Sequence, residues 1–424
     1  MRRPSILFIN RVYPPVRGAS GRVLSDLARS FAKEGWQVTV ITTGPSDKVE
    51  RDGAIKLIRI KAPERPKGAL SYLRIWMKML GEALRLPSSH IVVTMTDPPM
   101  LAVVGRLVSI FKKNRHIHWC QDLYPDLLPA LGVKVPRFMV SLCKAISRKA
   151  MKKSDKVIVV GRCMARHLSY DNFDPKQITV IPNWPDFELV RDHEEAYEQG
   201  EALLHFGGEK TKDSQNNEAN ELVRSYEEQK KYKPKFRVLY AGNIGRVHPV
   251  DTILDAAEDI NKDEHNDIEF VFVGDGPRYD YISQQRSKRN LDNIRLLPYQ
   301  PPSRIKSLME SGDIHIVSMK EEAAGMVVPC KLYSALAAQR PCVFVGPALS
   351  EPAKILNDFG AGIVVGQGQA KALAEAIRKM RYNSDVWFKA HKGAVEASQI
   401  FVPEESINAW IERAWGVLKA DLEE

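Results

Sequence analysis

The stretch FRVLYAGNIGRVHPVDTILDAA, residues 236–257, combines a strand, a glycine turn and a helix in one short run. Apolar residues fill most of 236–240, glycines follow at Gly242 and Gly245, and a helical segment comes next. Glycine permits the tight turn, and free N–H groups at the start of the following helix attract anions. The stretch therefore predicts a strand of a parallel sheet with an anion-binding turn at its carboxyl end.

Strand and helix alternate in this way over most of the chain. The predicted strands are Ser5–Asn10, Gln37–Thr42, Lys56–Ile60, Ile91–Thr94, His116–Trp119, Lys156–Val160, Phe236–Tyr240, Ile268–Val273, Ile294–Leu297, Ile314–Ser318, Pro341–Val345 and Gly362–Val365. Amphipathic segments such as Arg22–Glu34 lie between them. Because parallel strands need crossover connections, the alternation predicts an α/β protein with mostly parallel, doubly wound sheets.

A polar segment interrupts the alternation and divides the chain. Residues 191–235 are rich in Glu, Lys, Gln and Asn, and we expect them to connect two domains. The first domain is predicted over residues 1–190 and the second over 236–403. The helix of residues 404–424 is expected to pack on the first domain. A length of 424 residues suits two domains.

The composition is that of a globular protein with a basic balance. Hydrophobic residues make up 44% and charged residues 27%, and the net charge of +10 favours a negatively charged partner. The five cysteines are dispersed and never spaced as C-x-x-C, which disfavours disulfides and a zinc site and suits a reducing cytoplasm. No apolar run of about 18 residues occurs, and the first apolar run is too short for a signal peptide.

A second glycine turn lies in the first half. Arg17-Gly18-Ala19-Ser20-Gly21-Arg22 links a strand to a helix, as Gly242–Arg246 does in the second half. Each turn carries an arginine, which favours phosphate binding over the alternative of plain tight turns. Neither turn has the G-x-G-x-x-G spacing, and no G-x-x-x-x-G-K-[ST] occurs. A dinucleotide oxidoreductase and a P-loop ATPase are therefore disfavoured.

A third segment brings a lysine to the same edge of the second sheet. Residues 324–333, AGMVVPCKLY, follow the strand Ile314–Ser318 and lead into a helix. Lys331 is expected to carry a fixed positive charge into the anion site, with a solvated helix lysine as the alternative. Gly274-Asp275-Gly276-Pro277 is another strand-end turn and is weak evidence on its own.

Taken together, these motifs resemble the retaining glycosyltransferases of family 4, which have the two-domain GT-B fold, and among them the branch that builds bacterial surface polysaccharides. The second half carries the resemblance in YAGNIGRVHPVDTILDAA, FVFVGDGP, LPYQPPSRIKSLMESGDIHIVSM, VVPCKLYSALAAQRPCVFVG and SEPAKIL. The first half carries it in YPPVRGASGRVLSDLARSFAKEGWQVTVITT, QDLYPD and VIPNW. Only residues 190–220 fall outside it.

The resemblance implies a donor site with Arg246 and Lys331 as catalytic residues that stabilise the departing diphosphate. The donor-binding residues that it implies are Gly18, Gly242, Asn243, Gly245, Gly274, Asp275, Gly276, Tyr299, Gly325, Met326, Val327, Ser334 and Glu351. Asp122 is implied on the acceptor side. No D-x-D sequence occurs, so neither a metal nor another cofactor is expected.

The chain departs from the family pattern at two places. The family often has two glutamates eight residues apart in the donor loop, where this chain has Met326 and Ser334. A lysine often follows the glycine-arginine turn, where this chain has Val247-His248-Pro249. Lys331 is therefore predicted to be the main partner of Arg246 at the diphosphate.

The expected function is sugar transfer, with retention, from a nucleotide-diphosphate sugar to a glycan or lipid-linked acceptor in bacterial surface-polysaccharide synthesis. UDP is the expected nucleotide on family frequency, with GDP open. We expect a cytoplasmic protein in peripheral contact with the anionic inner face of the cell membrane. The amphipathic stretch Ala69–Leu86 supports this contact, with an ordinary domain helix as the alternative. A second basic stretch holds Lys144, Arg148, Lys149, Lys152, Lys153 and Lys156.

Three other functions compete with this one. A nucleotide-sugar epimerase shares the two-domain cleft, and the acceptor-like first half argues against it. A degenerate glycosyltransferase serving as a partner subunit is favoured by the missing glutamates and disfavoured by Arg246 and Lys331. A nucleic-acid partner is not expected, because no recognition motif accompanies the basic charge.

Overall fold

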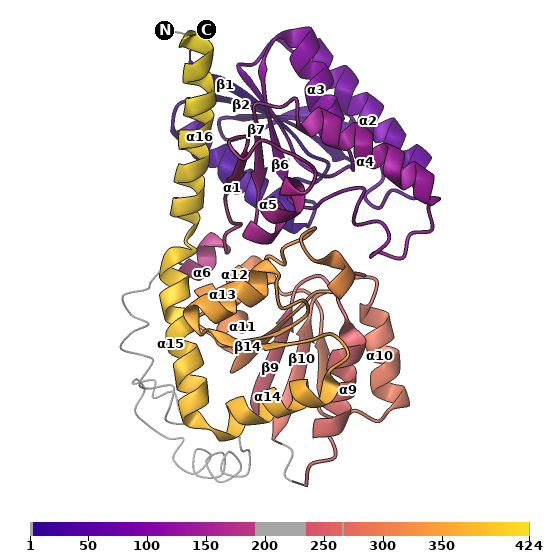
Figure 1. The fold of residues 1–424 in the computed structure, drawn as a ribbon, viewed down its shortest axis with the longest axis vertical. Helices are drawn as coiled ribbons and strands as arrows, with labels where there is room; N and C mark the ends of the chain where they lie inside the picture. The colour runs from indigo at the N-terminus through magenta and orange to yellow at the C-terminus, as the bar shows by residue number, and fades with distance from the viewer. Residues whose placement is uncertain (1–2, 191–234, 265–266, 424) are drawn as a thin grey trace, which may run out of the picture.

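The computed structural model describes residues 3–190, 235–264 and 267–423. These residues form two α/β units, each built around one sheet and stacked end to end (Figure 1). The predicted connection over residues 191–235 lies outside the described residues, apart from Lys235.

Both sheets are wound as the alternation predicted. The first has the strand order β3-β4-β2-β1-β5-β6-β7-β8 and the second β11-β10-β9-β12-β13-β14. The strands are β1 (Ser5–Ile9), β2 (Gln37–Gly44), β3 (Lys48–Asp52), β4 (Ile55–Lys61), β5 (Ile91–Thr94), β6 (Arg115–Cys120), β7 (Lys156–Val159), β8 (Ile178–Val180), β9 (Phe236–Ala241), β10 (Ile268–Val273), β11 (Ile294–Leu297), β12 (Ile314–Ser318), β13 (Cys342–Val345) and β14 (Gly362–Val365). Among these, β3 pairs antiparallel with β4, and the other pairs are parallel.

Helices connect the strands and cover both faces of each sheet (Figure 1). They are α1 (Ala19–Lys33), α2 (Gly68–Arg85), α3 (Leu101–Lys112), α4 (Arg137–Met151), α5 (Arg162–Ser169), α6 (Phe187–Val190), α9 (Val250–Ile260), α10 (Tyr279–Lys288), α11 (Ile305–Glu310), α12 (Lys331–Ala337), α13 (Glu351–Phe359), α14 (Ala370–Tyr382), α15 (Ser384–Ile400) and α16 (Pro403–Glu423), with short 3₁₀ turns at Pro302–Arg304 and Glu321–Ala323.

The sequence patterns missed two strands, β3 and β8. β3 has the sequence KVERD, and β8 is three residues long. Both lie at the edges of the first sheet, where a strand pairs on one side only. An edge strand needs no continuous apolar run, so hydrophobic periodicity gives little signal for it.

The last helix runs from the second unit along the first (Figure 1). Trp410 of α16 packs on Trp119 with ring centroids 4.8 Å apart, and Trp415 packs on Trp36 at 4.9 Å. Trp119 in turn stacks on Trp184 at 5.9 Å. Large buried aromatic rings contribute strongly to core stability, so α16 fastens the chain's last segment to the first sheet.

Candidate functional site

A cleft of about 600 Å³ lies between the two units. Its walls are loops that follow the carboxyl ends of β6, β9, β10 and β11, together with the start of α1 and residues 327–334. This is the edge at which open parallel sheets bind ligands. The predicted site residues that line the cleft are Asp122, Gly242, Asn243, Gly245, Arg246, Tyr299, Val327, Lys331 and Ser334.

Lys331 is the first residue of α12 and reaches across to the turn after β9. Its Nζ donates to the Tyr240 hydroxyl at 2.6 Å and to the Asn243 carbonyl oxygen at 3.2 Å, and it lies 3.9 Å from the centre of the Tyr240 ring. Burial of the ammonium lowers the pKa of Lys331 to about 7. Near pH 7 both the charged and the neutral form of Lys331 are therefore populated in the unliganded protein, because desolvation opposes the charged form. A positive charge at Lys331 beside a bound diphosphate stays a prediction.

Arg246 is exposed on the cleft wall and makes no ion pair within the described part of the chain. A second arginine spans the units nearby, because the Arg17 guanidinium lies 5.2 Å from the centre of the Tyr299 ring. Such cation–π contacts are favourable when the cation is partly desolvated. This contact joins the two units at Tyr299, which lines the cleft.

Gly274 and Gly276 lie beneath the Gly242 turn rather than on the cleft wall. A Cβ on Gly274 would overlap the carbonyl oxygen of Gly242, and a Cβ on Gly276 would overlap the Asn243 side chain. The Asp275 carbonyl accepts from Ile244 N at 2.8 Å, and the Asp275 carboxylate lies 3.3 Å from Arg65. These residues support the turn from below; direct contact with a donor stays a prediction.

Substituting Gly274 with alanine is expected to destabilise the protein by about 1–3 kcal/mol, because its φ of 146° is strained for an L residue and the new methyl group displaces the Gly242 turn. Thermal denaturation measures the loss. Gly416→Ala is the control, since Gly416 lies in α16 with open space around it and should gain stability. Equal midpoints for Gly274→Ala and the wild type would contradict the supporting role.

Asp122 lies on the first-unit wall and joins the two units through the backbone. It forms an isolated antiparallel bridge with Val327, and Leu123 N donates to the Met326 carbonyl at 2.8 Å. Burial, with a contribution from the charge of Asp97, raises the pKa of the Asp122 carboxyl to about 7. Asp97 itself is paired with Arg11 at 2.7 Å. Within the described ranges, no lysine, arginine or histidine forms an ion pair with Asp122.

The motifs QDLYPD and VIPNW meet at the same wall. Gln121 and Asn183 exchange side-chain hydrogen bonds of 2.9 and 2.8 Å, and the Asn183 amide also lies 3.1 Å from the Cys330 sulfur. Gln121 and Asn183 are both buried. Buried amides need such partners, so the pair fixes the loop that carries Asp122 against the segment that carries Lys331.

Glu351 does not line the cleft. Its carboxylate accepts from the backbone N of Arg162 at 2.6 Å, from Arg162 Nε at 2.8 Å and from Cys163 N at 3.3 Å. It therefore caps α5 of the first unit from α13 of the second, which satisfies N–H groups at a helix start. A contact between Glu351 and the donor stays a prediction.

Gly325, Met326 and Gly18 were also predicted to face the donor. Met326 N donates to the Ala323 carbonyl at 3.0 Å, so this amide is occupied. Gly325 has a φ of 73° and lies against Cys163 and His167 of the first unit. Gly18 precedes α1 and packs on Val12, while its neighbours Ala19 and Ser20 line the cleft.

Sequence reasoning missed two cleft residues, Arg22 and His248. Arg22 binds Asp26 at 3.0 Å and the Trp184 and Pro185 carbonyls at 2.5 and 3.0 Å. His248 donates from Nδ1 to the Ser318 carbonyl at 2.6 Å, and burial beside Lys331 lowers its pKa well below the usual value. Its Nε2 is left as an acceptor. Both residues belonged to segments that the sequence analysis had quoted. Arg22 is the last residue of the first glycine turn, and His248 lies in the stretch Val247-His248-Pro249, where the family often has a lysine.

Two family models match the chain. The one described as "Glycosyl transferase 4-like domain" matches residues 18–184, and the one described as "Glycosyl transferases group 1" matches residues 224–392. Together they span most of the two units. Two named relatives align over much of the chain. WcaI of Escherichia coli K12, a glycosyl transferase named for colanic acid biosynthesis, is 23% identical over 87% of this chain and 89% of its own length. WbjE of Pseudomonas aeruginosa, named as a glycosyltransferase, is 22% identical over 71% of this chain and 68% of its own length.

Solved structures show the same fold. Sucrose-phosphate synthase from Thermosynechococcus elongatus has a TM-score of 0.71 at 16% identity and covers 99% of this chain and 100% of its own. WaaG, a glycosyltransferase involved in lipopolysaccharide biosynthesis, has a TM-score of 0.67 at 16% identity over 95% and 99%. Anabaena HepE, solved with UDP, has a TM-score of 0.64 at 15% identity over 97% and 99%. The predicted GT-B fold is confirmed, and with the two matched models it shows that the chain belongs to the family 4 glycosyltransferases.

Proposed function

We propose that the enzyme transfers a sugar, with retention of anomeric configuration, from a UDP-sugar to a glycan or lipid-linked acceptor during synthesis of a bacterial surface polysaccharide, at the inner face of the cell membrane. The observation that carries the donor half is the Lys331 ammonium, held in the cleft beside the Gly242–Arg246 turn. HepE, which shares the fold, was solved with UDP and with UDP-glucose. The name of WcaI supports the polysaccharide.

The proposed mechanism is electrostatic. Breaking the bond between the anomeric carbon and the donor oxygen leaves negative charge on the diphosphate, which Arg246 and protonated Lys331 stabilise. The acceptor hydroxyl attacks from the leaving-group side, and its proton passes to the departing phosphate oxygen. Within the described residues, no cluster of three or more His, Cys, Asp or Glu side chains is arranged to hold a metal ion. In the proposal, cationic side chains supply the positive charge.

The donor site is tested by calorimetry with UDP and with GDP. We expect the wild type to bind UDP, and the Arg246→Ala/Lys331→Ala variant to bind it more weakly by about two orders of magnitude or more, because two charge-assisted contacts are lost. Lys288→Ala/Lys371→Ala is the matched control, since it removes the same charge from exposed positions on α10 and α14. If the wild type binds neither nucleotide, the donor site is refuted. That result would favour the alternative of a degenerate glycosyltransferase that serves as a partner subunit.

The affinity for UDP is expected to fall as the pH rises above about 7. A bound diphosphate raises the pKa of Lys331 from its unliganded value of about 7, so binding takes up a proton. The contribution of charged Lys331 to the binding free energy of UDP is fully present below pH 7. It is lost as the pH rises towards the higher pKa that Lys331 has in the complex. Calorimetry in buffers of different ionisation enthalpy measures the uptake. Lys331→Met should show none, and an unchanged affinity from pH 7 to 9 would contradict the linkage.

A further inference from the structure

Exposed apolar side chains occur on three neighbouring helices of the first unit. α2, α3 and α4 lie together on one flank, with α3 packed against both of the others (Figure 1). The exposed large apolar residues on them are Leu70, Leu73, Met77, Ile110, Phe111, Phe138, Met139, Leu142 and Ile146. Single exposed apolar residues are ordinary, but a group of this size on adjacent helices marks an interaction surface.

The apolar residues of the stretch Ala69–Leu86 are partly buried and partly exposed in the structure. Ile75, Met79 and Ala83 are buried and hold α2 on the sheet, while Trp76 is half-buried. Leu70, Leu73 and Met77 remain outside this contact. The helix is therefore an ordinary domain helix on one side and an apolar surface on the other.

α4 has buried side chains at one end only. Its buried residues, Ser147, Arg148, Ala150 and Met151, all lie in its last part. Phe138, Leu142 and Ile146 follow one another at helical spacing along the outside, and Phe138 is 72% exposed. The same line continues into Lys149 and Lys153. A short helix gains most of its stability from packing, so ten residues without a buried side chain point to an external partner.

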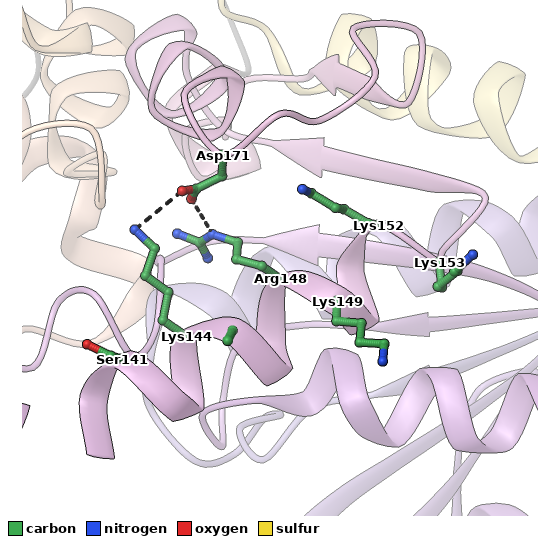
Figure 2. Close-up of a pocket in the computed structure, with 8 residues that line it drawn as sticks. Ser141, Lys144, Arg148, Lys149, Lys152, Lys153 and Asp171 are labelled. Atoms are coloured by element: carbon green, nitrogen blue, oxygen red, sulfur yellow. Dashed lines mark hydrogen bonds and ion pairs between the residues drawn. The ribbon is translucent and has the colours of Figure 1, made fainter. Parts of the chain in front are cut away.

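The basic end of α4 opens on a pocket of about 560 Å³. Figure 2 shows Lys144 and Arg148 directed at Asp171, with distances of 3.5 and 2.7 Å, while Lys149 and Lys153 point away from it. Among the described residues, no carboxylate pairs with Lys149, Lys152 or Lys153. Helices α2, α3 and α4 together carry nine Lys and Arg residues, whereas Glu82 is their one acidic residue and is paired with Arg85.

We propose that this surface binds an anionic lipid bilayer, with Phe138, Met139, Leu142 and Ile146 entering the headgroup region and Lys149, Lys152 and Lys153 contacting lipid phosphates. We call these seven residues the α4 face. Apolar insertion combined with basic residues is the chemistry of interfacial helices. No helix in the described ranges is long and apolar enough to cross a bilayer.

The segment that precedes α4 connects the α4 face with the cleft. Leu127 and Leu131 line the cleft, and the chain reaches α4 at Arg137. An acceptor anchored in the bilayer would therefore approach Asp122 along this segment. The inference deepens the proposed action at a membrane, but binding to lipid needs neither donor nor catalysis.

Co-sedimentation with vesicles tests the proposal. One set of vesicles is phosphatidylcholine alone, and the other contains phosphatidylglycerol as well. We expect the wild type to bind the anionic vesicles. The variant Lys149→Glu/Lys152→Glu/Lys153→Glu is expected to bind them at least about tenfold more weakly. Phe138→Ser/Leu142→Ser should also lose binding, and both changes lie on exposed positions. Lys288→Glu/Lys371→Glu/Lys389→Glu reverses the same number of exposed charges on the second unit and should bind like the wild type.

Four outcomes would overturn the proposal: no binding of the wild type to anionic vesicles, equal binding to both vesicle sets, an equal loss in the control variant, or a dimer that disappears with Phe138→Ser/Leu142→Ser. The last outcome, seen by light scattering, would assign the surface to a second copy of the chain. UDP binding is measured on every variant. Retained UDP binding with lost vesicle binding supports the proposal, whereas vesicle binding without UDP binding would refute the donor site and leave the lipid surface standing.

Discussion

Replacing Lys331 with alanine is expected to slow sugar transfer by about two to three orders of magnitude, the cost of removing one preorganised group that faces developing charge. The ammonium is fixed by the Tyr240 hydroxyl and the Asn243 carbonyl, so little reorganisation is needed when the diphosphate departs. Its low pKa in the unliganded protein means that the site is desolvated, and desolvation strengthens its interaction with a bound anion. Steady-state kinetics with a UDP-sugar and an acceptor measures the effect.

Two controls separate charge from structure in this experiment. Lys371→Ala removes a lysine from an exposed position on α14 and should leave the rate unchanged. Tyr240→Phe keeps Lys331 but removes the hydroxyl that orients it, so a smaller loss is expected. A Lys331→Ala enzyme with the wild-type rate and the wild-type melting temperature would show that the ammonium does not act on the diphosphate.

The parts of this site that depend on local sequence were predictable. A glycine-containing turn directly after an apolar strand identifies the carboxyl edge of a parallel sheet, and the Gly242–Arg246 turn lies there. Lys331 was found because it follows a strand of the same sheet and begins a helix. The strands at the centre of both sheets were predicted to within two residues at each end, since two-sided burial gives them continuous apolar runs.

The parts that depend on contacts between the units were not predictable. Glu351 caps α5, which lies nearly two hundred positions earlier in the chain, and no local pattern encodes that pairing. The bridge between Asp122 and Val327 likewise exists only when the two units meet. The lowered pKa of Lys331 has the same origin, because its burial depends on how Tyr240 and the turn after β9 enclose it. Residue type predicted a cation, and tertiary packing set its proton affinity.

Asp122→Asn is expected to reduce transfer to the acceptor by about 10–100-fold while leaving the affinity for UDP unchanged. The carboxyl lies on the first-unit wall of the cleft, within the cavity that also exposes Lys331 and Ser334. Because no cation pairs with this carboxylate in the part of the chain that the structure describes, it can accept a hydrogen bond from the hydroxyl of an incoming sugar. Hydrogen bonds to charged groups are worth about 1.5–3 kcal/mol. The amide keeps the shape but loses the charge, so the loss measures electrostatics rather than packing.

The pH dependence of the same reaction identifies the group responsible. Burial raises the pKa of Asp122 to about 7, so its charged form, and with it the hold on the acceptor, increases as the pH rises through 7. The charged form of Lys331 decreases as the pH rises through its pKa, which is about 7 in the free enzyme and is raised by the diphosphate in the donor complex that the acceptor meets. Because the two groups titrate in opposite directions, we expect a bell-shaped plot of kcat/KM for the acceptor against pH. The acidic limb of this plot should disappear in Asp122→Asn, and the basic limb should disappear in Lys331→Met. An acidic limb that persists in Asp122→Asn would assign it to another group and remove Asp122 from the acceptor site.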